Sequence, residues 1–268
     1  MELLRYEFFV NALLAAFFTS ISCGLIGTYI VSRRIVFISG GITHTSFGGV
    51  GLGYFIGINP IVGAAIFSLL SALGIEFLSK KAEVREDSAI AIMWSFGMAV
   101  GIIFVYLTPG YAPNLMGYLF GSILTVSRTE ILLIALLALI VFAFFIIFYR
   151  VILFVAFDTE FSLTRMIPAR FFGYLLISLV SVTIVLSIKV AGIILILSLL
   201  TIPQAAANIF VKEFKMIALL SVFIGLAASI AGLIGSYLFN IPSGAAIIFC
   251  LILLFLLLKG FKAVIMWR

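Results

Sequence analysis

The sequence predicts an all-α protein that crosses a membrane several times. Of its 268 residues, 65% are apolar and only 10% are charged, whereas a typical soluble domain has about 45–50% apolar and about 25% charged residues. Apolar runs of roughly 20 residues recur along the chain, and an α-helix needs about that length to cross the hydrocarbon layer of a membrane. So little charge cannot cover a water-facing surface, which excludes a soluble enzyme and a nucleic-acid-binding module.

The apolar runs, taken in order, define nine candidate membrane spans joined by short polar connectors. They are residues 8–31, 36–56, 60–78, 88–107, 131–148, 171–188, 191–210, 216–238 and 243–258. Segment 36–56 is the least apolar, because glycine, serine, threonine and a histidine interrupt it. Small residues let helices approach closely, so we expect this segment to contact other helices rather than lipid. The count is therefore eight or nine, in a single membrane domain over residues 1–268.

Basic residues occur mainly in every second connector, as they do in multi-pass proteins whose cytoplasmic loops hold the lysines and arginines. These connectors carry Arg33 and Arg34; Lys80, Lys81 and Arg85; Arg150, Arg165 and Arg170; Lys212 and Lys215; and Lys259, Lys262 and Arg268. With nine spans, this alternation predicts an extracellular N-terminus and a cytoplasmic C-terminus in the cell membrane. With eight spans, the N-terminus changes side.

Two connectors are expected to hold structure of their own. Residues 117–126 are apolar but too short to span, so they are interpreted as a partial helix at the outer face. Residues 157–170 fit a short amphipathic helix along the cytoplasmic surface, with a possible N-cap at Asp158 or Thr159 and a stop at Pro168. This helix is either a docking element for a partner or an interfacial linker without one.

The sequence contains no nucleotide-binding machinery. No Gly-Lys dipeptide occurs, so a phosphate-binding loop of the GxxxxGK[ST] type is absent, and a single histidine cannot form an HExxH site. We therefore expect a protein that is not an enzyme and has no permanently bound cofactor. Any work across the membrane must draw its energy from another chain.

His44, the only histidine, lies within segment 36–56. Ten residues separate it from Arg34, and at about 1.5 Å per residue this places it roughly 15 Å deep, near the middle of the bilayer. Ionisable groups at such depth usually line a pathway or have a partner. His44 is therefore either a nitrogen ligand on a cation pathway or a structural residue that hydrogen-bonds a carbonyl group or its neighbours Thr43 and Ser46.

Glu76 is the other ionisable residue well inside an apolar run, four residues before Lys80. This spacing places both side chains on one helix face. We interpret them as an ion pair that extends to the cytoplasmic interface.

Several stretches resemble the permease subunits of zinc and manganese uptake ABC transporters, the ABC-3 family. They are NALLAAFFTSISCGLIGTYIVSRR, GGITHTSFGGVGLGYFIG, REDSAIAIMWSFGMAVG, GYLFGSILTVS, FDTEFSLTRMIPAR, KVAGIILILSLLTIPQAAA and IPSGAAI. The resemblance extends over nearly the whole chain and implies a type II ABC importer permease fold. It also implies a homodimer, two cytoplasmic ATP-binding subunits that use ATP, and an extracytoplasmic metal-binding protein that delivers the cargo.

The resemblance also implies roles for particular residues. FDTEF is similar to the family's FDPEF segment, which assigns ATPase coupling to Asp158, Glu160 and Phe161 within a coupling helix near residues 157–168. His44 corresponds to the histidine of the family's D-A-x-x-H signature, implicated in metal passage. Gly40 stands where that signature has its aspartate, so this chain keeps only the nitrogen ligand of the pair.

The resulting hypothesis is a permease that imports zinc or manganese, with His44 as metal ligand and Gly40, Thr43 and Ser46 along the pathway. The alternative is a transport-inactive membrane scaffold or signalling subunit on the same fold, for which Gly40 is the one hint in the sequence.

Overall fold

The structure is a computed structural model that describes residues 5–109, 123–157, 162 and 165–266. Its elements are α1 (Glu7–Ser32), α2 (Val36–Ile56), α3 (Pro60–Lys80), α4 (Glu86–Leu107), the 3-10 turn η2 (Ile123–Thr125), α6 (Arg128–Ile147), α7 (Tyr149–Phe157), α9 (Ala169–Leu199), α10 (Ile202–Phe210), α11 (Phe214–Phe239) and α12 (Ser243–Met266). The described residues contain no strand, so the predicted all-α class is confirmed.

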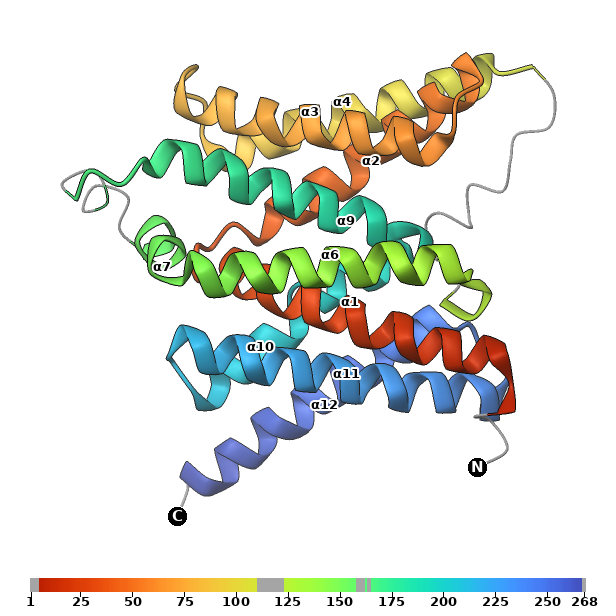
Figure 1. The fold of residues 1–268 in the computed structure, drawn as a ribbon, viewed down its shortest axis with the longest axis vertical. Coiled ribbons are helices and arrows are strands. Elements are labelled where there is room, and N and C mark those ends of the chain that lie inside the picture. The colour runs from red at the N-terminus through yellow and green to blue at the C-terminus, as the bar shows by residue number, and fades with distance from the viewer. Residues whose placement is uncertain (1–4, 110–122, 158–161, 163–164, 267–268) are drawn as a thin grey trace.

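Long helices run back and forth across the molecule, with the N- and C-termini at opposite ends (Figure 1). The connectors α1–α2, α3–α4, α7–α9 and α10–α11 therefore lie at the end that holds the C-terminus. These are the connectors in which the basic residues concentrate. The structure thus has the alternation that the positive charges predict.

Eight segments of the described chain are long and apolar enough to cross a membrane. They are Glu7–Ser32, Pro60–Ser79, Glu86–Leu107, Arg128–Ile147, Ala169–Ile188, Val190–Phe210, Phe214–Phe239 and Ser243–Ile265. The helix α2 is not among them, although its 21 residues match the others in length. The predicted number of spans is eight or nine because one long helix of this chain, α2, is too polar to face lipid.

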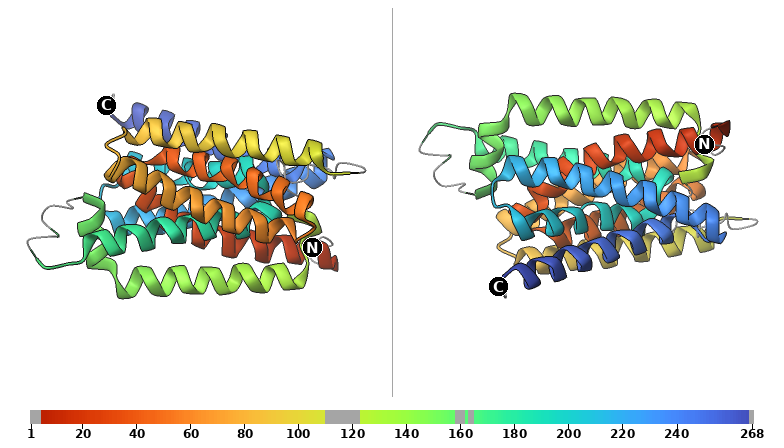
Figure 2. Two further views of the ribbon diagram at one scale, coloured as in Figure 1. Left: turned by 90° about the horizontal axis from the view of Figure 1, so that it is seen from above. Right: turned by 90° about the horizontal axis from the view of Figure 1, so that it is seen from below.

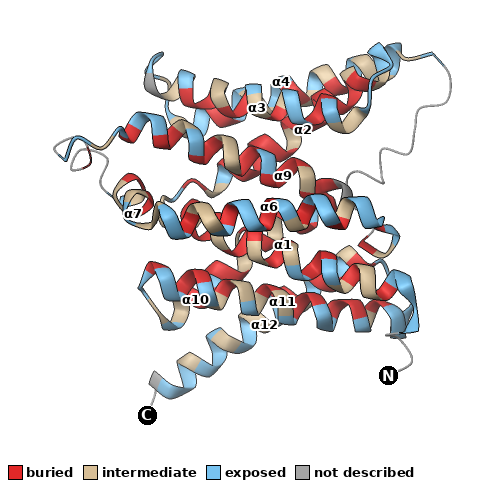
Figure 3. Cartoon of the chain, viewed as in Figure 1, coloured by how far each residue is buried: buried red, intermediate tan, exposed pale blue. Residues whose placement is uncertain are grey.

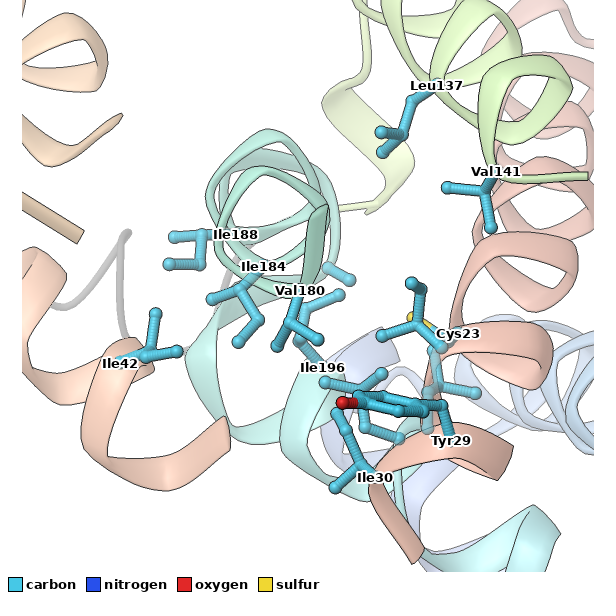
Figure 4. Close-up of a cluster of buried hydrophobic side chains, with 14 of the residues drawn as sticks. Cys23, Tyr29, Ile30, Ile42, Leu137, Val141, Val180, Ile184, Ile188 and Ile196 are labelled. Carbon is cyan, nitrogen blue, oxygen red and sulfur yellow. The ribbon is translucent and has the colours of Figure 1, made fainter. Parts of the chain in front are cut away.

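The helix α9 lies at the centre of the bundle. It contacts α1, α2, α3, α6, α7, α10 and α12, whereas α6 and α12 lie on opposite outer faces (Figure 2). The outer surfaces of α4 and α12 are largely exposed (Figure 3), as expected for helices that face lipid. The core around α9 consists of branched aliphatic side chains such as Val180, Ile184 and Ile196, together with Tyr29 and Cys23 of α1 (Figure 4).

The chain changes direction within α9 at Gly192. This residue has φ 78° and ψ 162°, a conformation that only glycine adopts without strain. This turn lies close to the predicted boundary between residues 188 and 191. After the turn, α10 leads back to the end of the molecule that holds the C-terminus (Figure 1).

The two predicted connector helices fall mostly on residues that the structure does not describe. Of 117–126, residues 117–122 lie outside the described part, and only Ile123–Thr125 is seen as a 3-10 turn. Of 157–170, residues 158–161 and 163–164 lie outside it. Pro168 immediately precedes α9, and α7 is a separate short helix that the apolar pattern did not indicate.

The helix α2 is enclosed because glycines bring its backbone against α3 and α4. A Cβ atom placed on Gly49 would clash with the Gly63 carbonyl group of α3 and lie 2.7 Å from the Ala64 Cα. One placed on Gly48 would lie 2.6 Å from the Gly97 carbonyl oxygen of α4. Most of α2 is buried as a result. The expectation that this segment contacts helices rather than lipid is confirmed.

A buried charge cluster joins α1, α3 and α4 near the end that holds the C-terminus. Glu76 is only 3% exposed, so other helices enclose its side chain, and the expected ion pair with Lys80 stays a prediction. The hydroxyl of Tyr29 accepts a hydrogen bond of 2.8 Å from Arg33 Nη1. Burial acts to lower the pKa of the Arg33 guanidinium, but Tyr29, Glu76 and Glu86 outweigh it, and the pKa is raised. The negative charge of Glu76 therefore favours the charged form of the Arg33 guanidinium. The side chain of Lys80 lies outside the described part of the chain.

The contact between α2 and α3 predicts a different response for two glycines. Gly49→Ala should destabilise the protein by about 1–3 kcal/mol, because the added methyl group meets fixed backbone atoms. Gly235→Ala in α11 is the matched control, since a Cβ there has no neighbour within 4 Å. Thermal unfolding in detergent measures both, and equal melting temperatures would contradict the described packing of α2.

The charge cluster predicts that Glu76→Ala costs about 2–3 kcal/mol. The change leaves a partly buried guanidinium with less opposing charge, and breaking a buried pair costs more than losing an exposed one. Glu7→Ala is the control, because Glu7 and Arg128 form an exposed pair at 2.6 Å whose loss should cost about 1 kcal/mol or less. Denaturation curves in detergent compare the variants. If the Glu76 variant were as stable as the Glu7 variant, the described burial of Glu76 would be contradicted.

Candidate metal pathway

His44 lies on α2 and stacks on Trp94 of α4. The ring centroids are 4.2 Å apart and the planes are inclined by 9°, so the two rings are nearly parallel. Both side chains are partly exposed. The contact fixes the imidazole plane relative to two helices, because a stacked pair resists tilting of either ring.

The two imidazole nitrogens have no hydrogen-bond partner within the described part of the chain. A structural histidine would be expected to bond a carbonyl group or a neighbouring hydroxyl. The nitrogen lone pair lies in the ring plane, and the stacked indole covers only the ring face. A nitrogen of His44 is therefore available to a cation.

Gly40 lies one helical turn before His44, on the same face of α2. A Cβ atom added to Gly40 would be 3.5 Å from Trp94 Cζ3 and 3.9 Å from Leu197 Cδ1, which are ordinary contact distances. Position 40 and the imidazole thus share one neighbour, the Trp94 indole. The structure places these two predicted site residues together and leaves room for a side chain at position 40.

Thr43 and Ser46 are buried, and their hydroxyls bond to carbonyl groups of α2 itself. The Thr43 hydroxyl donates to the Ser39 carbonyl oxygen, and the Ser46 hydroxyl donates to the Thr43 carbonyl oxygen at 2.6 Å. Ser46 also lines an apolar cavity of about 10 Å³ between α2, α3 and α9, a volume close to that of one water molecule. The place of Thr43 and Ser46 along the pathway stays a prediction.

The described residues contain no group of three or more histidine, cysteine, aspartate or glutamate side chains that could hold a metal ion. One chain therefore offers a single nitrogen at this place. Such a site suits brief contact with a passing cation, because a full ligand set would retain it.

The residues assigned to ATPase coupling, Asp158, Glu160 and Phe161, lie outside the described residues. Their neighbours are placed: α7 ends at Phe157, and α9 begins at Ala169, at the end of the molecule that holds the basic connectors (Figure 1). Met166, close to this segment, is 94% exposed. The coupling assignment stays a prediction.

Sequence reasoning did not identify Trp94 as part of the site. The sequence does hold one indication of its role. Tryptophan concentrates at membrane interfaces, but Trp94 lies eight residues after Glu86, the first residue of α4, and so lies deeper than an interface residue. Its pairing with His44 joins residues 50 positions apart and depends on how α2 and α4 pack.

Residues 5–262 match the sequence pattern of the ABC 3 transport family. A membrane protein of Synechocystis sp., slr2045, is 38% identical over 98% of this chain and 93% of its own length. The manganese transport system membrane protein MntC of Halalkalibacterium halodurans is 33% identical over 92% of this chain and 85% of its own.

A solved structure shows the same fold. PsaBC from Streptococcus pneumoniae, in complex with Fab, superposes with a TM-score of 0.84 and is 30% identical in sequence. The match covers 96% of this chain and 92% of that one. Fold and sequence therefore agree over nearly the whole length.

Proposed function

Because the chain belongs to the ABC 3 transport family, we propose that it is the permease subunit that carries a divalent transition metal ion, zinc or manganese, into the cell. As a member of this family with eight apolar candidate spans, it is a multi-pass membrane protein, and the family is one of transporters rather than enzymes. The relative MntC, named as part of a manganese transport system, supports a metal as cargo.

The observation that carries the proposal is the imidazole of His44. It is the only histidine of the chain and lies on the enclosed helix α2, about two turns from the start of that helix. It has no hydrogen-bond partner among the described residues and remains partly accessible. A neutral imidazole is a good ligand for first-row transition metals, so its position within the membrane fits a transient cation contact.

Energy coupling is proposed to come from partner chains. The sequence has no phosphate-binding loop, so ATP hydrolysis falls to two cytoplasmic ATP-binding subunits. The end of α7 and the start of α9, which border the expected coupling helix, lie at the end of the molecule that holds the basic connectors. This end would face the cytoplasm under the positive-inside rule. A homodimer would bring two copies of α2 to one pathway, and an extracytoplasmic metal-binding protein would deliver the ion.

Loss of the His44 nitrogen should impair transport more than stability. In proteoliposomes containing the complex, His44→Ala is expected to reduce zinc or manganese uptake by about tenfold or more. Stability should fall by only about 1 kcal/mol, because the side chain loses stacking and no hydrogen bond. Ser39→Ala, which removes a hydroxyl that donates to the Val36 carbonyl oxygen, is the control and should keep uptake. Unchanged uptake in His44→Ala would remove this residue from the mechanism.

Charge reversal in the coupling segment should separate the permease from its ATPase. Asp158→Arg combined with Glu160→Arg is expected to abolish co-purification of the ATP-binding subunit, because reversed charges oppose a polar docking contact. Glu83→Arg with Asp87→Arg makes the same change in charge, in the α3–α4 connector and the first turn of α4, and should retain the subunit. Normal co-purification with the first pair would contradict the assignment. ATPase recruitment without any metal uptake by the parent complex would favour the transport-inactive alternative.

A further inference from the structure

The stacking of His44 on Trp94 leaves one ring face and the ring edge of the imidazole for other contacts. The rings are nearly parallel at 4.2 Å, so the indole acts as a wall beside the imidazole rather than as a hydrogen-bond partner. Ligation of a metal uses a lone pair in the ring plane. Trp94 therefore sets the direction of that lone pair without blocking it.

The side chains next to the Trp94 indole at this place are apolar. The space next to Gly40, one turn from His44, is bordered by Trp94 and by Leu197 of α9. No aspartate or glutamate occurs on α2 or α9. The acids of α4 are Glu86 and Asp87 in its first turn, at least seven residues before Trp94 and so about 10 Å away along the axis. Glu76 of α3 acts on Arg33.

Ligand chemistry separates the two candidate cargoes at such a place. Carboxylate and other oxygen ligands suit manganese, whereas imidazole suits zinc and the later first-row metals. The same nitrogen ligand also binds zinc more tightly than manganese in the general affinity order of divalent metals. A carboxylate at position 40 would add an oxygen ligand on the same helix face, and glycine supplies none.

We propose that Trp94 and Gly40 determine the specificity of the His44 site, making it a carboxylate-free nitrogen site that prefers zinc to manganese. Trp94 is a positioning residue that holds the imidazole plane, and Gly40 leaves the cation without an oxygen ligand from α2. This inference rests on the proposed function and names its substrate class more narrowly. It concerns the binding step, which can be measured separately from uptake.

The fluorescence of Trp94 can report metal binding at His44, because the two rings are in contact. The chain has two tryptophans, Trp94 and Trp267, so Trp267→Phe leaves Trp94 as the single indole fluorophore of the full-length permease. Zn²⁺ or Mn²⁺ alone is titrated into this protein in detergent. We expect Trp94 emission to respond to Zn²⁺ at concentrations at least about tenfold lower than to Mn²⁺. The response should disappear with His44→Ala, which keeps the fluorophore and removes the ligand.

Substitutions at the two specificity positions complete the test. Gly40→Asp should make Trp94 emission respond to Mn²⁺ at lower concentration, and so reduce the ratio between the Mn²⁺ and Zn²⁺ concentrations that are needed. Gly40→Ala adds no oxygen ligand and should leave that ratio unchanged. In uptake assays on the complex, Trp94→Phe should retain the zinc preference. Trp94→Leu should raise the KM for zinc with a smaller change in kcat, whereas a merely structural tryptophan would lower the yield and leave KM as it is.

The outcomes distinguish this inference from the proposed function. Equal responses to both metals, a response that persists in His44→Ala, or no effect of Gly40→Asp would overturn the inference. Preferential uptake of manganese by the parent complex would also overturn it, and the proposed import of a divalent metal would stand. A zinc-selective, His44-dependent emission change in a complex that takes up neither metal would support the site and overturn the proposed function.

Discussion

The enclosure of α2 by α3 and α4 is the constraint on which the rest of the structure depends. This helix is too polar to face lipid, so its place in the bundle requires partners on most sides. Glycines at the contacts with Gly63 and Gly97 allow the backbones to meet directly. Once α2 is held in this way, one of its faces is directed at α4, and the only histidine of the chain lies on that face.

Glu76 and His44 both lie within apolar helices, but their surroundings differ. Glu76 is almost completely buried and acts on the Arg33 guanidinium, which is itself bonded to Tyr29, so its charge is compensated near one end of the bundle. His44 is partly exposed, and no compensating group is found among the described residues. A compensated charge stabilises a fold, whereas a group left accessible and without a bond is available to a passing ion.

Much of the fold follows from apolar periodicity, because lipid imposes one length on every crossing helix. The spans and the turn near residue 190 are predictable for that reason, as is the shared face of Gly40 and His44, which requires only helix geometry. The burial of Glu76 and the stacking of Trp94 on His44 depend on contacts between helices, and local spacing carries no information about them. For Glu76, spacing predicts a partner on the same helix but not the burial of the side chain. Thr43 and Ser46 are close to His44 in sequence, and their hydroxyls bond to carbonyl groups of α2, which local spacing alone does not predict.

The reversal at Gly192 also bears on how the chain enters the membrane during synthesis. The reversal lies within α9, with helix on both sides of Gly192 and no loop between its two arms. The two arms form a helical hairpin, and we expect such a hairpin to enter the membrane as a pair once both arms have left the ribosome. Because α9 contacts most other helices of the bundle, assembly of the core has to wait for that paired insertion. Gly192 thus sets the order of events in biogenesis as well as the direction of the chain.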